Sequence, residues 1–180
     1  MTTSSTPNST APAVSLPAAG TYQIDPARSG TTFTTRHLFG LGKVTGSLAM
    51  LDGQVIIAAE PAASTVEATL VADSFQSASA GRDKVVKSPG YLDVDRHPHL
   101  TFASTALVRA GQGWLVRGTL TARGVAAPVE LTVTDIAEDG DEVTVHATAT
   151  VDRYAHGLTK GRGLAARRLH LQFTAVATRT

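Results

Sequence analysis

Cysteine is absent from this chain of 180 residues, and aromatic side chains make up only 5% of it. Without cysteine the protein can form no disulfide, no thiolate metal site and no cysteine nucleophile. The 16 lysines and arginines are balanced by 15 aspartates and glutamates, so the basic excess typical of nucleic-acid-binding proteins is missing. No window holds the roughly 20 apolar residues of a membrane span, so we expect no stable membrane insertion.

The first 20 residues lack charged side chains and long apolar runs, and Ser, Thr, Pro and Ala dominate them. A secretory signal would need a basic start followed by an apolar core. We therefore expect a disordered tail over residues 1–20, one domain over residues 21–180, and a cytoplasmic protein.

Alternation of apolar and polar residues is what the remaining sequence does contain, and this alternation predicts strands. The Asp52-Gly53 dipeptide between two alternating runs predicts a hairpin turn. The expected strands cover residues 21–25, 31–38, 43–51, 54–59, 65–74, 100–108, 114–121, 129–135, 142–151 and 168–178.

This succession of antiparallel strands is typical of a sandwich or an up-and-down barrel. Each strand has one apolar face, and a single sheet can bury such a face by curling into a barrel, which also removes its edges. Small inward residues such as Gly46, Ala68 and Gly118 predict a cavity inside. The alternative is an interior filled by four aromatic side chains: Phe33, Phe102, Trp114 and Phe173.

Residues 79–92 interrupt the alternation. Ser79 is a candidate helix N-cap, a charged helical turn follows from Arg82 to Lys87, and Pro89 stops it. We expect this short helical insertion to lie across one end of the barrel.

Five stretches in order resemble the YceI-like family of polyisoprenoid-binding or lipid-binding domains, and together they span nearly all of residues 21–179. They read TYQIDPARSGTTFTTRHLFG, KVTGSLAML, ADSFQSASAGRDKVVKSPGYLDVDRHPHLTFAST, VRGTLTARGVAAPVELTV and TVDRYAHGL. The chain departs from the family pattern at Val85-Val86, where a His-Leu pair is usual, at Tyr91-Leu92, where two Phe are common, and in residues 161–168, where an acidic turn is usual.

The resemblance implies an extended, eight-stranded, antiparallel, lipocalin-like barrel whose lumen holds a polyisoprenoid or another long-chain amphiphile, with no cofactor. A phosphate head group would prefer arginines at the mouth, for which the candidates are Arg82, Arg153, Arg162 and Arg167. The expected lumen residues are Phe33, His37, Leu48, Leu70, Phe102, Val116, Leu120, Leu131, Val145, Tyr154, Leu171 and Phe173.

Two other readings stay open: a small barrel enzyme using His37 or Tyr154 on a hydrophobic substrate, and a stress-related module with a filled core. No recognised catalytic motif or metal-ligand spacing is present, so we expect neither catalysis nor a metal site. His146 and His170 share the polar parity of their strands and are expected to face solvent. A homodimer formed through a sheet edge or the insertion is left open.

Overall fold

The computed structural model describes residues 13–37, 42–161 and 165–180, and strands dominate this part of the chain. One α-helix, α1 (Ala80–Lys87), and three short 3-10 turns, η1 (Pro61–Ala63), η2 (Ala72–Ser74) and η3 (Arg153–His156), accompany the strands. The strands are β1 (Gly20–Ile24), β2 (Gly30–His37), β3 (Gly42–Ile57), β4 (Thr65–Val71), β5 (Gln76–Ser77), β6 (His99–Ala110), β7 (Gly113–Ala122), β8 (Val125–Asp139), β9 (Glu142–Asp152) and β10 (Arg168–Arg179).

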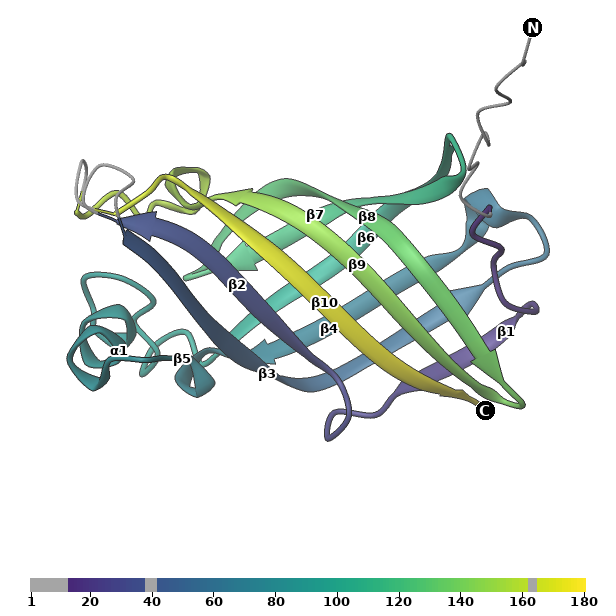
Figure 1. Ribbon diagram of the computed structural model, residues 1–180, viewed down its shortest axis with the longest axis horizontal. Coiled ribbons are helices and arrows are strands. Elements are labelled where there is room, and N and C mark those ends of the chain that lie inside the picture. Colours follow the sequence, from purple (N-terminus) through teal and green to yellow (C-terminus); the bar gives the residue numbers. More distant parts are fainter. Residues whose placement is uncertain (1–12, 38–41, 162–164) are drawn as a thin grey trace, which may run out of the picture.

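Eight antiparallel strands close into a barrel, as the sequence predicted. Neighbours follow the order β2, β3, β4, β6, β7, β8, β9 and β10, and β10 pairs again with β2. The β9–β10 ladder is long, extending from the Arg168–Asp152 pair to the Thr178–Glu142 pair. Figure 1 shows the resulting elongated barrel, whose strands run obliquely to its long axis. Closure leaves these eight strands with partners on both sides.

Strand β1 continues the position of β2 between the same two neighbours. It pairs with β10 around Tyr22–Arg179 and with β3 around Tyr22–Val55, beyond the Gly30 end at which β2 begins. Pro26 lies in the break between β1 and β2. Proline has no backbone N–H, so inside a strand it would interrupt the ladder of hydrogen bonds, whereas in this break it does not. The two short strands therefore form one interrupted position of the barrel wall.

The hairpin expected at Asp52-Gly53 is wrong. β3 runs through this dipeptide, and a β-bulge between Met50 and Asp52 absorbs one extra residue. Gly53 is needed for a different reason: a Cβ there would collide with the side chain of Ile24 on β1. Close approach of two strands, rather than a turn, explains this glycine.

Further bulges change which residues face inward. One lies between Ser104 and Ala106 on β6, and another between Val133 and Asp135 on β8. A bulge shifts the inside–outside alternation by one residue. Leu107 is therefore buried, whereas unbroken alternation from Phe102 would have pointed Ala106 and Val108 inward instead.

Two ends of the barrel can be distinguished, and we call them the loop end and the terminal end. The loop end comprises the described residues of segments 35–45, 72–99, 121–126 and 150–170, and it includes α1. The terminal end holds β1, the β8–β9 turn and the C-terminus (Figure 1). Among the described elements, the α-helix lies at the loop end.

The helical insertion forms as predicted. The Ser79 hydroxyl accepts a hydrogen bond from the backbone N–H of Arg82, and the helix ends at Lys87, with Ser88 as its C-cap just before Pro89. The Ser77 hydroxyl donates to Asp83 and accepts from Arg82 Nε, which ties β5 to α1. This network fixes α1 across the loop end of the barrel.

Part of the expected tail lies in the described chain. Residues 13–20 run along the terminal end, where the N–H of Val14 donates to the carbonyl of Gln112. The carbonyl of Val14 in turn accepts from the indole N–H of Trp114 and from Arg109. Contacts with the barrel therefore begin before β1.

Candidate functional site

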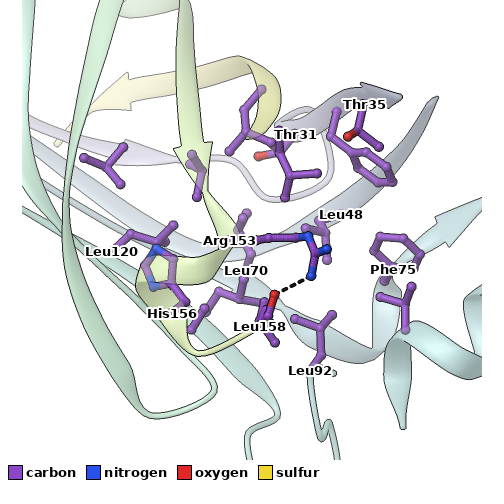
Figure 2. A pocket seen from close by; sticks show the side chains of 18 of the residues that line it. Thr31, Thr35, Leu48, Leu70, Phe75, Leu92, Leu120, Arg153, His156 and Leu158 are labelled. Carbon is purple, nitrogen blue, oxygen red and sulfur yellow. Dashed lines mark hydrogen bonds between the residues drawn. The ribbon is translucent and has the colours of Figure 1, made fainter. Parts of the chain in front are cut away.

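The loop-end half of the barrel contains a cavity of about 440 Å³. Its wall is mainly aliphatic and aromatic, and the described residues that line it include no Asp or Glu. Figure 2 shows Leu48, Leu70, Leu92 and Leu120 among the side chains around it. A volume in this range is typical of small-molecule sites.

The terminal half of the barrel is filled. Leu107, Val116 and Val133 form one buried cluster there, and Tyr22 and Ile24 from β1 belong to another. None of these five residues lines the cavity. The space therefore lies in one half of the barrel, with a filled core at its inner end.

Two glycines of the barrel wall, Gly46 and Gly118, are covered by aromatic rings, so their small size does not itself create the cavity. The ring of Phe33 lies directly over Gly46, and the ring of Phe102 lies over Gly118. Aromatic rings that cover glycines on neighbouring strands pack flat against the sheet. The glycines thus make room for phenylalanine rings, and the rings form the wall.

A second aromatic contact closes the side of the cavity nearest β5. Phe33 and Phe75 stack with ring centroids 5.0 Å apart. Phe75 belongs to a buried cluster with Val44, Leu92 and Leu158. Chain from the insertion and from the segment after η3 therefore helps to complete the apolar wall.

Arg153 is the most enclosed charged side chain of this wall, with only 6% of the residue exposed. It donates hydrogen bonds to four backbone carbonyls, of Leu158, Lys160, Ala165 and Ala166 (the first is drawn in Figure 2). Among the ion pairs of the described chain, none joins Arg153 to a carboxylate. Four of its five N–H groups are engaged in this way, and its charge is met by carbonyl dipoles.

Arg167 and Tyr154 lie on the outer side of the same loop. The guanidinium carbons of Arg153 and Arg167 are 4.8 and 5.2 Å from the centroid of the Tyr154 ring. Arg167 forms an ion pair with Asp152, and its hydrogen bond holds the pKa of that carboxyl below the ordinary value. Asp152 also accepts the N–H of Tyr154, so it both caps η3 and neutralises Arg167.

His156 is another buried polar residue of the lining, and its Nδ1 lies 3.0 Å from the carbonyl oxygen of Val125. A carbonyl only accepts, so this contact requires a proton on Nδ1. The bond anchors η3 to the start of β8. We therefore assign His156 to the support of the wall.

Most residues expected in the lumen do line this cavity. They are Phe33, Leu48, Leu70, Phe102, Leu120, Leu131, Leu171 and Phe173. Val116 and Val145 belong instead to the filled half, and Tyr154 is outside the lining, against two arginines. His37 ends β2 with a side chain outside the described part of the structure.

The candidate head-group residues separate in the same way. Arg82 and Arg153 line the cavity, whereas Arg167 is exposed and paired with Asp152. Arg162 lies outside the described residues. The structure thus brings two of the four arginines to the cavity, from α1 and from η3.

Several lining residues were missed by the sequence analysis: Thr31, Val44, Phe75, Leu92, His156 and Leu158. Thr31 shares the inward parity of Phe33, and this alternation was a signal that could have identified it. The others in this group, apart from Val44, come from irregular segments, where no periodicity marks the inward face.

Two other features of the described chain bear on function. His146 and His170 are exposed and contact Thr174 and Thr150, which confirms their predicted outward direction. No group of three or more His, Asp or Glu side chains within the described ranges could hold a metal ion. None of the helices in that same part is long and apolar enough to cross a membrane.

Similar sequences and structures agree with this architecture. UPF0312 proteins of Pectobacterium carotovorum and Ectopseudomonas mendocina are 34% and 35% identical over 110 and 127 residues, which is 61% and 68% of this chain. The matched parts cover 57% and 66% of those proteins, less than two thirds of either.

Two solved structures share the fold. Burkholderia cenocepacia BcnA is 23% identical with a TM-score of 0.74, over 86% of this chain and 99% of its own. A polyisoprenoid binding domain from Saccharophagus degradans, implicated in plant cell wall breakdown, is 12% identical with a TM-score of 0.63, over 88% of this chain and 98% of its own. The YceI-like domain model matches residues 22–177, which is most of the barrel. By this match and by its fold, the chain belongs to the YceI-like domain family.

Proposed function

We propose that this protein binds a long-chain amphiphilic lipid, of which a polyisoprenoid is one example, inside the loop-end cavity. The observation that carries the proposal is the cavity of about 440 Å³ with a mainly apolar wall and no carboxylate in its described lining. Each methylene group moved from water into such a space contributes about 0.8 kcal/mol. Hydrocarbon is therefore the chemistry that the cavity favours.

Two comparisons support binding rather than catalysis. The chain belongs to the YceI-like family, and one structural neighbour is a polyisoprenoid binding domain. The neighbour is only 12% identical, so it supports the fold and leaves the identity of the ligand to experiment. We propose that the protein carries or sequesters its ligand without transforming it.

The head group of the ligand is proposed to be anionic and to lie near Arg82 and Arg153. Both arginines line the cavity, and Arg153 retains one N–H beyond the four that bind carbonyls. A buried guanidinium without a carboxylate partner gains from a nearby phosphate or carboxylate. The hydrocarbon chain would then extend from these arginines toward Phe33 and Phe173.

The test compares two ligands with the same 20-carbon chain, geranylgeranyl diphosphate and geranylgeraniol, added to delipidated protein. We expect both to bind and the diphosphate to bind more tightly. Leu171→Trp fills the cavity and should weaken binding of both at least tenfold, because Leu171 lines it. Gln172→Trp places the same ring on the outer face of β10 and should leave both affinities unchanged, since Gln172 is exposed.

Failure of the native protein to bind either ligand would overturn the proposal of a lipid site. Equal affinity for the diphosphate and the alcohol would remove only the assignment of an anionic head group.

A further inference from the structure

Among the buried side-chain nitrogen and oxygen atoms of the described chain, the hydroxyl oxygen of Thr31 (Oγ1) is the one that lacks a hydrogen-bond partner. The residue is 2% exposed and lines the cavity, and Figure 2 shows its hydroxyl among the lining side chains. Buried hydroxyl groups in proteins are normally hydrogen-bonded, and an unpaired one is destabilising. An orphan hydroxyl in the wall of a cavity therefore points to a partner that the protein itself does not supply.

The position of Thr31 is deep in the cavity. It pairs with Leu48 on β3 and Phe173 on β10, on the way toward the filled half of the barrel. Thr35, four residues further along β2, lies at the loop end, about 13 Å away at the usual rise per residue. The arginines come from η3 and α1, which also belong to the loop end.

Water is a poor partner for this hydroxyl. A buried water needs two to four polar contacts, and the neighbours of Thr31 across both ladders are leucine and phenylalanine. The other polar and charged side chains of the described lining are Thr35, Arg36, Arg82, Tyr91, Arg153 and His156, and all come from the loop end. A polar atom carried on the ligand can reach this depth without needing further protein partners.

We propose that Thr31 forms an inner polar subsite that selects lipids bearing a hydroxyl or carbonyl oxygen on the part of the chain that enters the barrel. This inference rests on the proposed function and refines the ligand class. The preferred ligand has two polar groups, an anionic one at the loop end and a neutral hydrogen-bonding one at Thr31, separated by hydrocarbon.

The experiment measures the affinity of unbranched fatty acids with 8 to 16 carbons and of their ω-hydroxy counterparts. In the native protein we expect the ω-hydroxy acid to gain relative to the plain acid at the chain length that places its hydroxyl beside Thr31. In Thr31→Val, which keeps the shape and removes the hydroxyl, that relative gain should fall about tenfold, while affinity for the plain acids is retained. The unliganded variant should be at least as stable as the native protein, because an unsatisfied group is removed.

Thr32→Val is the matched control on the same strand. Thr32 is exposed on β2 and does not line the cavity, so loss of its hydroxyl should not change the preference between plain and ω-hydroxy acids. An equal preference in native protein and Thr31→Val at every chain length would overturn the inner subsite, even with plain acids bound. If the native protein binds no acid of either series, the proposed lipid site fails together with this inference.

A separate observation concerns charge. The described residues of the loop end carry eleven Lys or Arg side chains against five Asp and no Glu. The rest of the described chain carries four Arg against ten Asp or Glu. A protein that is nearly neutral overall is thus about six charges positive at one end and about six negative over the remainder. Such an asymmetry orients a molecule in the field of a charged surface.

Two of the four large apolar side chains that are exposed in the described chain lie at the loop end, and the other two, Leu51 and Ile56, lie outside it. Val85 on α1 and Val125 at the start of β8 are 51% and 40% exposed, and both belong to the loop end. Exposed lysines lie in the same region, with Lys84 beside Val85 on α1 and Lys43 at the start of β3. Cations combined with exposed apolar groups are the features that adsorb proteins to anionic lipid surfaces.

We infer that the loop end docks on an anionic lipid surface, so that the cavity faces the source of its ligand. The positive charge of the loop end is complementary to an anionic lipid surface. The negative charge of the rest of the barrel is repelled by the same surface, which disfavours docking in other orientations. The contact is electrostatic and reversible, and it weakens as salt screens the charges.

Sedimentation with phosphatidylcholine vesicles that contain 30% phosphatidylglycerol tests this docking. We expect binding at low salt, loss of binding in high salt, and none to pure phosphatidylcholine. Lys43→Gln/Lys84→Gln should weaken binding about 30-fold, since each basic side chain contributes about 1 kcal/mol near an anionic surface. Gln54→Glu/Gln112→Glu changes the net charge by the same amount at exposed sites outside the loop end and should have little effect.

Equal losses in the two double variants would show that net charge, and not the loop end, governs the contact. No binding to anionic vesicles at low salt would overturn the membrane assignment and leave an acidic protein as the alternative partner for this surface.

Discussion

Arg153 is the residue on which the loop end of the cavity most depends. Its four hydrogen bonds join the backbone carbonyls of Leu158, Lys160, Ala165 and Ala166 to one side chain. In Arg153→Met these carbonyls lose their donor while the alkyl stem remains, and we expect the free energy of unfolding to fall by about 3 kcal/mol or more. Urea denaturation measures the loss.

Arg168→Met provides the comparison, because Arg168 is exposed on the same segment of chain. It should change stability by less than about 0.5 kcal/mol. Similar losses in both variants would mean that Arg153 does not organise the loop end.

The ion pair between Arg28 and Glu142 predicts a pH dependence. Arg28 donates to both carboxylate oxygens at 2.5 and 2.8 Å, and these hydrogen bonds lower the pKa of Glu142 below its ordinary value. The pair therefore stabilises the fold fully above the ordinary carboxyl pKa, and the contribution is lost as pH falls through the lowered one. The effect is small because the pair is solvent-exposed.

Melting temperatures of native protein and Glu142→Gln, measured from pH 7 to pH 3, check this expectation. The difference between them should narrow toward acid pH. A difference that stays constant over this range would show that the carboxylate charge does not contribute.

Single residues were predictable where strand alternation places them, and His146 and His170 are examples. Thr31 was overlooked although it obeys the same alternation, because threonine occurs on both faces of these strands and its lack of a partner is visible only in three dimensions. Arg153 was a candidate for an anion contact, but its bonds to carbonyls follow from the path of a loop that no local pattern specifies.

At the scale of elements, two glycine substitutions should have opposite effects. A Cβ at Gly118 would collide with the ring of Phe102 and the backbone of Ala103, so Gly118→Ala should lower stability by about 1–3 kcal/mol and push the ring toward the cavity. Gly81 in α1 has open space around it, and Gly81→Ala should raise helix stability by up to about 1 kcal/mol.

Thermal unfolding and lipid affinity of the two variants are the measurements. Weaker lipid binding in Gly118→Ala and unchanged binding in Gly81→Ala would agree with the cavity wall described above. A tolerated Gly118→Ala would indicate that Phe102 does not pack on this glycine.

Helix α1 could be predicted because its signals are local: a capping serine, a charged turn and a terminating proline. The Asp52-Gly53 turn was mispredicted because the same dipeptide serves a bulge and the close approach of β1, and both are long-range features. Strand boundaries and inward faces fail at bulges for the same reason.

For the whole molecule, the barrel followed from the one-sided apolar character of its strands. That only half of the interior is open did not, since it depends on how Leu107, Val116 and Val133 meet across the barrel. The charge asymmetry could not be predicted from the nearly balanced net charge of the chain. It becomes apparent only when each turn and loop is assigned to one end of the barrel.

Native mass spectrometry of freshly purified protein, before and after delipidation, tests the lipid site most directly. We predict a mass excess that corresponds to one amphiphilic lipid per chain, that disappears on delipidation, and that is absent from Leu171→Trp but present in Gln172→Trp. Protein that carries no lipid and takes up none when long-chain isoprenoids are added would contradict the account.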